Sequence, residues 1–589
     1  MSTKVKVKTS GKVLIIFLIL AGIFAGKVFW YDNLPQDAKE STVVGQLALP
    51  DAPEASLSGK VEQLSLPQAD AVTGAPKVVW KVMAWNSQFP LMYANGGPRT
   101  TAGSLFQSLG VNIQIERQDD CNKTIADLVA FAQAYKENPS TPGVFASFMG
   151  DGMPAFFSAL TKELEPLGPE YQPIAFYTMG KSYGEDQLMG PIDWKRNPQS
   201  AKGKTVSVVL RDGDMNIVLK WAGDNGIKVN PDETSYDPSA INLIAANDFL
   251  DAANKYITGY REKRKLVQDG KKVNIDTTVG VDAVSTWTPG DVNIAQGKGG
   301  LVTIASTKQY SSQMPNITIT IKKFAYDNRS LMENIIIGLS RAGDQVRSFT
   351  SAKKFAADVS AQVYNEKNGD YWLRYYNGVK TKDAQGLSVE LGGSMAFNLA
   401  DAANMFGLGN DRIDRYRVVY KTFGDINSKM YPEYMATYPE YTKVVDKSFM
   451  ASILSNHPEL LEGKSLTVNY ASEVSSEVSS KAYHIQFRTG SSEILPGSYS
   501  DLDRILESAV VAENLTLGVY GHTDDVGNPE SNQRLSEARA QSVKNYLVRK
   551  GLRPDRIEAK GFGESNPIES NLSESGRATN RRVQIVLGE

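Results

Sequence analysis

The first hydrophobic pattern along the chain is an almost unbroken apolar run over residues 13–31, VLIIFLILAGIFAGKVFWY. A helix of about 20 apolar residues is long enough to cross a bilayer, so this run predicts a transmembrane helix. Lysines precede it and carboxylates follow it, and basic residues favour the cytoplasmic side. We therefore expect residues 1–12 to be a basic cytoplasmic tail and the rest of the chain to lie on the other side of the membrane. The flanking charges are Lys4, Lys6, Lys8 and Lys12 before the run and Asp32, Asp37 and Glu40 after it.

A cleaved signal peptide is the alternative interpretation of this segment. Cleavage requires small residues in an A-x-A-like arrangement. Ala25 has Ile23 two positions before it, and Ala21 has Ile19. Neither is a good cleavage site, and no cysteine lies nearby to carry a lipid. The sequence therefore favours a retained, single-pass anchor.

Beyond the anchor, residues 32–76 show no sustained hydrophobic period and are rich in Pro, Ala, Ser and acidic residues. Such composition is typical of a flexible linker. As a random coil it would reach roughly 40 Å, since the end-to-end distance grows with the square root of length.

Residues 77–450 alternate between strand-like and helix-like segments. The strand candidates are KVVWKVMAW from Lys77 and GKTVSVVL from Gly203, and the helix candidates are KTIADLVAFAQAY from Lys123 and MNIVLKWAGDNGI, which Gly226 ends. Alternation of this kind predicts a mainly parallel sheet covered by helices. The region is long enough for two lobes. Residues 451–481, which contain SEVSSEVSS from Ser472, are predicted to be a second linker.

A small C-terminal domain is predicted over residues 482–589. AYHIQF and LTLGVYGHT have the pattern of strands, residues 500–511 that of a helix, and RIEAKGFGE and RRVQIVL follow as further strands. LSEARAQSVKNYLVRKG is predicted to be a long helix that ends at Gly551. The order is βαβαβ with a final strand. The predicted buried stripe of the long helix is Leu535, Ala538, Val543 and Leu547.

Composition removes several classes of function. The 589 residues carry a net charge of −2, so no general basic excess supports nucleic-acid binding. Cys121 is the single cysteine and the three histidines are scattered, which excludes disulfides and argues against a metal site. G-x-S-x-G, P-loop and H-E-x-x-H motifs are absent, and GKGGL near Gly297 lacks the Ser or Thr of a P-loop. We expect no enzyme activity, no cofactor and no metal.

The C-terminal motifs GHTDDVG, LSEARAQSV, GFGESNPI and GRATNRRVQI, with Asn532 between the first two, occur in an order and spacing that resemble the OmpA-like peptidoglycan-binding domain. The resemblance covers roughly the last hundred residues. It implies that Asp524 and Arg539 hold the diaminopimelate of the peptidoglycan stem peptide. It also implies that Asn580 and Arg581 line the same groove, with Arg582 as an alternative to Arg581. The segment FRTGSSEILPGS from Phe487 differs from the family's usual turn.

The chemistry of these residues suits that ligand. Diaminopimelate presents an ammonium and a carboxylate on one carbon, and one carboxylate and one guanidinium held apart can bind both groups. Thr523 and Asn532 offer neutral hydrogen bonds beside the pair. The structural alternatives are an ion pair between Asp524 and Arg539, or Asp524 as the cap of the following helix.

The middle region resembles, more loosely, two-lobed periplasmic solute-binding proteins of the nitrate, taurine and phosphate type. The segments that carry this resemblance are AKGKTVSVVLRDGDMNIVLKWAGDNGI, VGVDAVSTWTPGDV and DNRSLMENIIIGLSRA. A Ser or Thr before a helix can bind an anion or merely cap the helix, and a Trp is more often core than ligand contact. The candidate solute-binding residues are Trp85, Asn86, Thr100, Thr101, Asp151, Asp214, Asn216 and Trp287.

Together these features predict an α/β protein: a two-lobed periplasmic-binding-protein-like domain, a small C-terminal βαβαβ OmpA-like sandwich and one N-terminal transmembrane helix. The expected function is an inner-membrane-anchored periplasmic protein that binds peptidoglycan and carries a solute-binding-like sensor or recruitment domain. The expected partners are peptidoglycan, the lipid bilayer and a small solute, with an ABC permease or a channel subunit as a further partner. Whether the chain forms a homo-oligomer is left open.

Two alternatives to this function are a tethered substrate-binding component of an ABC importer and a stator-like subunit of an ion-driven complex. A stator requires an ionisable carboxylate within its membrane span, because the carboxylate carries the ion. The run from Val13 to Gly26 contains none.

Overall fold

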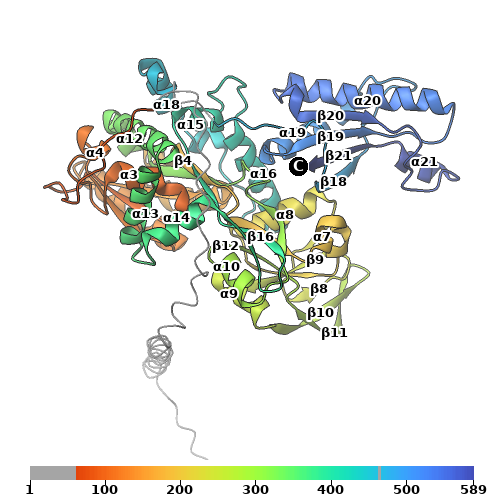
Figure 1. Ribbon diagram of the computed structural model, residues 1–589, viewed down its shortest axis with the longest axis horizontal. Coiled ribbons are helices and arrows are strands. Elements are labelled where there is room, and N and C mark those ends of the chain that lie inside the picture. Colours follow the sequence, from red (N-terminus) through yellow and green to blue (C-terminus); the bar gives the residue numbers. More distant parts are fainter. Residues whose placement is uncertain (1–60, 462–465) are drawn as a thin grey trace, which may run out of the picture. The chain divides into compact units, whose positions relative to one another are not determined.

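The computed structural model describes residues 61–461 and 466–589 of the protein (Figure 1). The predicted tail 1–12, the predicted span 13–31 and the first part of the predicted linker lie outside the described residues. Within the described ranges, every helix is too short or too polar to pass through a bilayer.

A first six-stranded sheet has the strand order β17-β4-β14-β3-β1-β2. In β1 the sequence VVWKV buries Val78, Trp80 and Val82 completely, so hydrophobic alternation correctly located this strand. The strands are β1 (Val78–Val82), β2 (Ile113–Arg117), β3 (Gly143–Met149), β4 (Pro173–Ser182), β14 (Pro315–Ile321) and β17 (Ser394–Ala396). Helices that accompany them are α3 (Phe89–Asn95), α5 (Cys121–Glu137), α6 (Met153–Leu164), α12 (Arg329–Ser348) and α13 (Thr350–Tyr364).

A second six-stranded sheet has the order β13-β5-β12-β6-β9-β7. The chain enters it between β4 and β5 and leaves it between β13 and β14. Its strands are β5 (Asp186–Gly190), β6 (Thr205–Val209), β7 (Val229–Asn230), β9 (Ile241–Ala246), β12 (Ala283–Trp287) and β13 (Val302–Ser306). Its helices include α8 (Gly213–Asp224), α9 (Phe249–Ile257) and α10 (Gly290–Gly297).

The prediction of mainly parallel sheets is wrong in part. β1, β2 and β3 pair in parallel, as do β7, β9, β6 and β12, but β14, β4 and β17 in the first sheet and β5 and β13 in the second pair antiparallel. Four of these strands, β4, β5, β13 and β14, flank the two passages of the chain between the sheets. β4, β5 and β14 are buried along their whole length, so they lack the alternation that marks a strand with one exposed face.

Two helices that follow strands of these sheets are each capped by an aspartate side chain. The predicted helix from Lys123 begins at Cys121, because the Asp120 side chain accepts hydrogen bonds from the amides of Asn122 and Lys123. Helix α8 begins after Asp212, whose carboxylate accepts from the Gly213 amide at 2.7 Å. A carboxylate at this position satisfies amides that have no partner within the helix.

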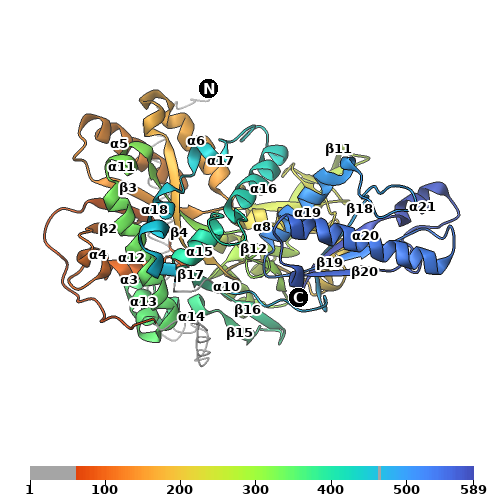
Figure 2. The ribbon, with the colours of Figure 1, turned by 90° about the horizontal axis from the view of Figure 1, so that it is seen from above.

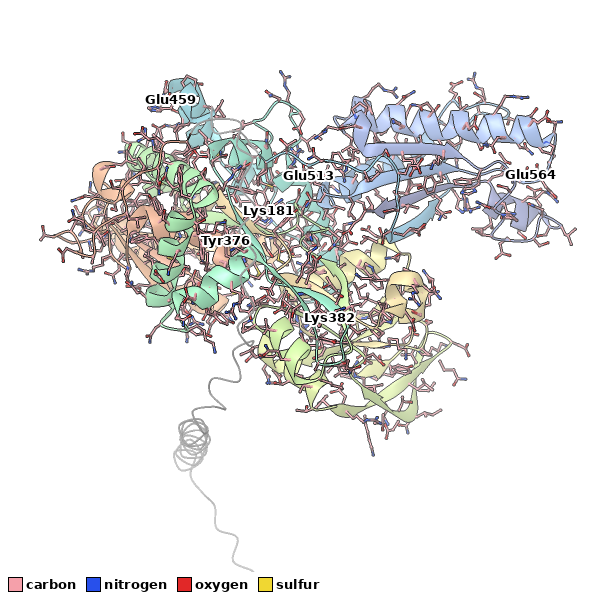
Figure 3. All side chains as sticks on the ribbon, viewed as in Figure 1. Lys181, Tyr376, Lys382, Glu459, Glu513 and Glu564 are labelled. Atoms are coloured by element: carbon pink, nitrogen blue, oxygen red, sulfur yellow. The ribbon has the colours of Figure 1, made fainter. Side chains whose placement is uncertain are left out.

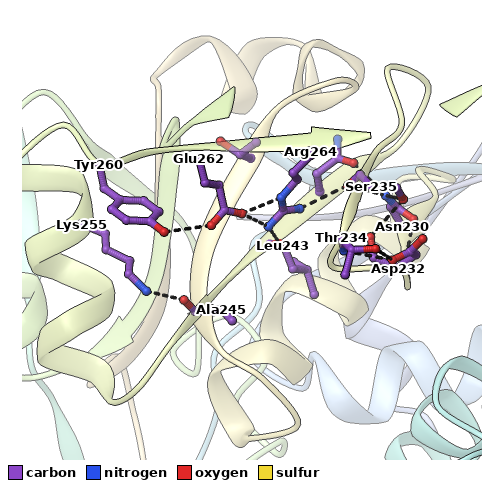
Figure 4. Close-up of polar contacts among 12 residues, drawn as sticks. Asn230, Asp232, Thr234, Ser235, Leu243, Ala245, Lys255, Tyr260, Glu262 and Arg264 are labelled. Carbon is purple, nitrogen blue, oxygen red and sulfur yellow. Dashed lines mark hydrogen bonds and ion pairs between the residues drawn. The ribbon is translucent and has the colours of Figure 1, made fainter. Parts of the chain in front are cut away.

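A hairpin of β10 (Arg261–Gln268) and β11 (Lys271–Gly280) is tied to the second sheet by one buried arginine (Figure 4). Arg264 donates to Glu262 at 2.6 Å, to the Leu243 carbonyl at 2.6 Å and to the Ser235 carbonyl at 3.3 Å. These bonds compensate for burial of the guanidinium, which is 3% exposed. The hydrogen bonds of Arg264 therefore hold the hairpin against the second sheet.

Both predicted linkers are partly structured. Within residues 32–76, the described part from residue 61 runs along the middle domain, where the Gln68 and Val72 amides donate to the Ala102 and Thr100 carbonyls at 2.9 Å. The 451–481 segment contains the end of helix α18 (Ser448–Asn456) and begins strand β18 (Glu477–Tyr483). Composition does not reveal such packing, because these bonds form to partners distant in sequence.

Other helices of the middle region are α4 (Leu105–Ser108), α7 (Asp193–Arg196), α11 (Lys322–Asp327), α14 (Gly369–Asn377), α15 (Leu399–Met405), α16 (Arg415–Met430) and α17 (Tyr441–Val444). The remaining strands are β8 (Ser235–Tyr236), β15 (Val379–Lys382) and β16 (Ser388–Leu391). Figure 2 shows α12 and α13 side by side at one end of the first sheet.

The C-terminal domain is a four-stranded sheet of order β18-β21-β19-β20 with its long helix on one face (Figure 1). Its elements are β18, α19 (Tyr499–Val511), β19 (Thr516–Gly521), α20 (Pro529–Arg549), β20 (Ile557–Gly561), α21 (Glu574–Asn580) and β21 (Val583–Gly588). The α/β sandwich is confirmed.

Two details of the C-terminal prediction are wrong. The strand expected at AYHIQF lies earlier, since β18 ends at Tyr483. On α20, Val543 and Leu547 are buried as predicted, whereas Ala538 is exposed and Leu535 is only half-buried. The small polar residues Ser536 and Asn532 are buried instead.

The described residues from 61 onward belong to one compact unit, and Glu513 connects the C-terminal domain to the middle region. Its carboxylate pairs with Arg415 of α16 at 2.7 Å and accepts from the Ser312 hydroxyl at 2.9 Å (Figure 3 labels Glu513). Burial alone would raise the pKa of Glu513, but Arg415 and Lys181 outweigh it and hold the pKa below its usual value. Glu513 is thus a charged contact between the two parts.

Candidate functional site

The C-terminal candidate site is built where β19 ends and α20 begins. The turn between them needs Gly521, because a Cβ at that position would lie 2.3 Å from the Ser536 carbonyl oxygen of α20. This close approach of strand and helix places Asp524 in the connecting loop and Arg539 on the helix. Asp524 is 8% exposed, and its Oδ1 accepts from the Val526 amide at 3.2 Å.

Asp524 pairs with Arg581, which precedes β21, and not with Arg539. The Asp524 Oδ2 to Arg581 Nη1 distance is 2.5 Å. The second amino group of Arg581 lies 2.7 Å from Glu574, so this guanidinium bridges two carboxylates. The helix cap is Asn528, whose side chain accepts from the Glu530 and Ser531 amides. Neither structural alternative considered for Asp524 is therefore present in the structure.

Arg539 is held by contacts that leave much of its guanidinium uncommitted. Its Nε donates to the Ser491 carbonyl at 3.2 Å, and the guanidinium carbon lies 4.9 Å from the centre of the Phe487 ring. Burial lowers the pKa of Arg539, and the nearby Asp524 carboxylate opposes that shift. Within residues 61–461 and 466–589, Arg539 forms no ion pair, so a carboxylate ligand would meet a charged and unneutralised group.

Thr523 and Asn532 lie beside this pair. The Thr523 amide donates to the Gly563 carbonyl at 2.9 Å, and its buried hydroxyl has no hydrogen-bond partner among the described residues. The Asn532 amide group donates to Glu564 at 2.7 Å and to the Asp524 carbonyl at 3.3 Å. Glu564, labelled in Figure 3, is a site neighbour that the sequence analysis missed. Its place in the GFGE motif was the available signal.

Asn580 and Arg582 are buried and hold the neighbouring loop by hydrogen bonds. Asn580 is fully buried, its oxygen accepts from the Ile568 and Glu569 amides, and its nitrogen donates to Glu569 and Asn571. All its bonding capacity thus holds the loop at 568–571. Arg582 is 5% exposed and donates to the Asn566 carbonyl at 3.2 Å.

His522 is a structural member of the same motif. Its ring stacks on Phe562, with centroids 5.4 Å apart and planes 10° apart. Burial, reinforced by the neighbouring Arg582, lowers the pKa of His522 to about 4. The imidazole is therefore neutral at physiological pH.

A second candidate site is a cavity of about 280 Å³ between the two six-stranded sheets. Its wall comes from the ends of β1, β2 and β3 on one side and of β6, β9 and β12 on the other. Carboxyl ends of parallel strands are the usual place for ligands in open α/β sheets. Of the predicted solute residues, Trp85 and Trp287 line this cavity.

The other predicted solute residues lie elsewhere. Thr100 is fully buried and donates to Asn95 at 2.6 Å, and Thr101 faces a separate hollow beside Phe355. Asp151 and Asn216 line a different cavity and bond to each other at 3.3 Å.

Asn86 and Asp214 are buried next to the cavity wall but do not line it. Both amide atoms of Asn86 and both carboxylate oxygens of Asp214 are without hydrogen-bond partners among the described residues. Burial, with acidic neighbours led by Asp186, raises the pKa of Asp214 well above its ordinary value.

Several cavity residues were missed from the sequence. Asp212 and Asp248 could have been found, because each directly precedes a helix that follows a strand. The others had no sequence signal that separated them from ordinary strand, helix or loop residues. The missed lining residues are Arg117, Asp119, Asp186, Asp212, Asp248, Phe249, Glu366 and Trp372. Across the described ranges, His, Cys, Asp and Glu side chains form no group of three suited to a metal ion.

Comparison with known proteins defines the class of the C-terminal domain. A family model described as OmpA family matches residues 486–581. These residues therefore form an OmpA-family domain. The match begins after the middle region ends, and it includes both Asp524 and Arg539.

Curated relatives share this part of the chain. It is 45% identical over 94 residues to outer membrane protein A of Bordetella avium, covering 16% of this chain and 48% of the relative. It is 41% identical over 100 residues to outer membrane porin F of Pseudomonas fluorescens, covering 17% and 31%. It is 37% identical over 103 residues to the peptidoglycan-binding protein ArfA of Mycobacterium bovis, covering 18% and 32%. The chain thus spans a third to a half of the length of these relatives.

Solved structures match the same region. A putative MotB-like protein from Desulfovibrio vulgaris is 29% identical, with a TM-score of 0.18, covering 18% of this chain and 72% of that one. The cell wall anchor of the T6SS from Pseudomonas aeruginosa is 26% identical, with a TM-score of 0.17, covering 24% and 96%. Scores this low carry no structural argument.

Proposed function

We propose that the protein binds peptidoglycan through its C-terminal domain. The observation that carries the proposal is the arrangement of Asp524 and Arg539: two opposite charges that lie near each other without forming an ion pair with each other. The similarity to a relative named as a peptidoglycan-binding protein supports the same assignment.

The proposed ligand is the diaminopimelate of the stem peptide. Its carboxylate meets the Arg539 guanidinium, which can bond bidentately, and its ammonium meets Asp524. Because Arg581 occupies Asp524 Oδ2 in the unliganded groove, the ammonium has to replace this contact or share the carboxylate with it. The Thr523 hydroxyl, which lacks a partner in the described structure, supplies a further polar contact.

In the proposed setting, residues 13–31 anchor the protein in the inner membrane and the remaining chain is periplasmic. The hydrophobic run and its flanking charges support this arrangement. The protein then links membrane and cell wall, and its middle region serves as a solute-binding-like sensor or recruitment domain. Two six-stranded sheets with a cavity between them support that role.

A second candidate function is delivery of a solute to an ABC importer, with the wall domain as an accessory tether. The cavity lined by strand ends favours this alternative. A delivery protein would have to bind the solute and stimulate transport by a permease, whereas a sensor would bind the solute without supporting transport. The stator-like role has no supporting observation in the described residues.

Sedimentation with purified sacculi tests the wall-binding proposal. The double variant Asp524→Asn with Arg539→Gln is expected to stay in the supernatant while the unaltered protein pellets. Arg549→Gln removes one positive charge from the exposed far end of α20 and is the control for the Arg539→Gln substitution. Equal pelleting of the double variant and the unaltered protein would contradict the proposal.

A further inference from the structure

The cavity between the two sheets has a strongly acidic wall. Five carboxylates and one guanidinium line it. The guanidinium, Arg117, is already paired with two of the carboxylates, Asp119 at 2.6 Å and Glu366 at 2.9 Å. In the described structure no basic side chain pairs with the other three carboxylates, which are Asp186, Asp212 and Asp248. The wall therefore keeps a negative charge with no internal counterpart.

Asp186 is the carboxylate that most clearly lacks a partner. It is 4% exposed, it lines the cavity, and its Oδ2 makes no hydrogen bond within the described residues. Burying an acceptor without a partner is costly, so such an oxygen usually awaits a ligand or an ordered water. Burial raises the pKa of Asp186 to about 7, and the acidic neighbours Asp212 and Asp291 add to that shift.

Three helix N-termini at the cavity, those of α5, α8 and α9, do not offer an anion site. Anions bind at helix starts through free amides. Here Asp212 accepts from the first amide of α8, and Asp248 accepts from the Asp251 amide of α9 at 2.7 Å. Asp120 does the same for α5. First-turn amides of these three helices are therefore already hydrogen-bonded to aspartate carboxylates of the protein itself.

The rest of the wall is aromatic. Trp287 stacks on Phe249 with ring centroids 4.2 Å apart, and Trp85 and Trp372 line the same cavity. Aromatic faces attract cations, most strongly when the cation is shielded from water. Anions gain nothing from these faces. Carboxylates and tryptophans together therefore suit an ammonium group carried on an apolar body.

We propose that this cavity binds a small organic cation, whose ammonium group lies between Asp186 and the aromatic wall formed by Trp287, Phe249, Trp85 and Trp372. This inference rests on the proposed solute-binding role of the middle region and specifies its ligand class. It also departs from the anionic solutes of the nitrate, taurine and phosphate type that the sequence suggested. The absence of a three-residue metal group among the described residues favours an organic cation over a metal ion.

Calorimetry on the full-length protein tests this proposal with matched probes. The cations are choline and putrescine, the neutral counterpart of choline is 3,3-dimethyl-1-butanol, and the anions are phosphate, sulfate and methanesulfonate. We expect at least one cation to bind at least tenfold more tightly than the neutral alcohol, and no anion to bind. Tryptophan fluorescence should change on addition of the same cation, because Trp85 and Trp287 line the cavity.

Variants connect the binding to this cavity. Asp186→Asn preserves shape and removes the charge, and it should weaken cation binding at least tenfold. Trp287→Leu should do the same through the aromatic wall. Asp193→Asn removes an exposed carboxylate of the same lobe and should have no effect. Circular dichroism of each variant shows whether it is folded. Because Asp186→Asn and Trp287→Leu alter different walls of the cavity, binding data from one folded variant are sufficient to test the site.

The outcomes separate the inference from the function on which it rests. Binding of an anion without binding of a cation would overturn the inference and keep the solute-binding role. Binding of no probe would overturn both. Cation binding that survives both Asp186→Asn and Trp287→Leu would place the site elsewhere and overturn the inference.

Discussion

The carboxylate of Asp524 is paired with Arg581 at 2.5 Å, while Arg539, the other expected ligand group, is held over the Phe487 ring with no ion pair in the described structure. The unliganded groove is therefore neutralised on its acidic side and open on its basic side. This asymmetry gives Asp524, Arg539 and Arg581 different roles, and it yields a separate prediction for each charge.

Loss of either ligand-facing charge should weaken wall binding. Arg539→Gln and Asp524→Asn are each expected to reduce affinity for a diaminopimelate-containing muropeptide by about ten- to a hundredfold, on the order of 1.4–3 kcal/mol, since one charged end of the ligand loses its partner. Calorimetric titration of each purified variant measures this. Unchanged affinity in Arg539→Gln would show that the guanidinium does not contact the ligand.

Removal of Arg581 should have the opposite effect. Arg581→Gln frees Asp524 from a competing cation, so we expect affinity for the same muropeptide to be unchanged or to rise by about threefold, roughly 0.7 kcal/mol. The salt dependence of binding should also change, since one arginine fewer surrounds the site. A loss as large as that of Asp524→Asn would instead assign Arg581 to the ligand.

Asn580 should matter for stability. Asn580→Ala leaves two partly buried amides and one carbonyl of the loop at 568–571 without their partner, and we expect a total loss of about 1–3 kcal/mol because water replaces part of these bonds. Chemical denaturation followed by circular dichroism measures the change. Asn545→Ala, on the exposed side of α20, is the control and should differ from the unaltered protein by less than about 0.5 kcal/mol. Similar stabilities for the two variants would refute the assigned role.

Acidification should destabilise the C-terminal domain through His522. The pKa of His522 is about 4 in the folded state against an ordinary value near 6.5. Above pH 6.5 the ring is neutral in both states and contributes no pH dependence. Between pH 6.5 and pH 4 the unfolded chain binds a proton that the folded chain excludes, so stability falls, by on the order of 2 kcal/mol.

Hydrogen exchange of the β19 amides, measured at several pH values, reports this change locally. In His522→Gln the same amides should show a smaller loss of protection between pH 6.5 and pH 4, because no imidazole is left to titrate. Carboxylates that titrate in this range act in both proteins and cancel in the comparison. Identical pH profiles would disprove the contribution of His522.

Glu513 should control the contact between the C-terminal domain and α16. In Glu513→Gln the buried Arg415 keeps Asp411 at 2.6 Å but loses its second carboxylate, and we expect a loss of about 1–3 kcal/mol. Thermal unfolding and exchange at α19 amides measure it. Glu507→Gln breaks an exposed pair with Lys421 at 3.2 Å between the same helices and should cost less than about 1 kcal/mol. Equal effects would mean that burial of the Glu513 pair is unimportant.

Sequence patterns located most elements of the protein but not their pairing. The alternation in VVWKV and the helical period from Cys121 onward follow from local burial, which the sequence records directly. The direction of β4, β5, β13 and β14 depends on how the chain passes between the sheets. Both orientations of a fully buried strand have the same composition, so pattern alone does not decide between them.

The motifs of the C-terminal domain predicted that Asp524 and Arg539 lie near each other, and they do, because the strand end at Gly521 and the helix that follows it in sequence also adjoin in space. They did not show that Asp524 is paired with Arg581, 57 residues later, or that Asn580 is fully used in holding a loop. In the middle region, Trp85 and Trp287 were found, whereas Asp186 was not.

The sequence by itself determined which segments form strands and helices, where the OmpA-family motifs lie and which residue types they carry, because these properties depend on neighbours within a few positions. The tertiary structure alone decided which charges are neutralised and which remain open. Arg117 is paired with Glu366, Asp186 keeps one carboxylate oxygen without a hydrogen-bond partner among the described residues, and Arg539 lies over the ring of Phe487. Electrostatic interaction depends on distance and burial, and folding fixes both.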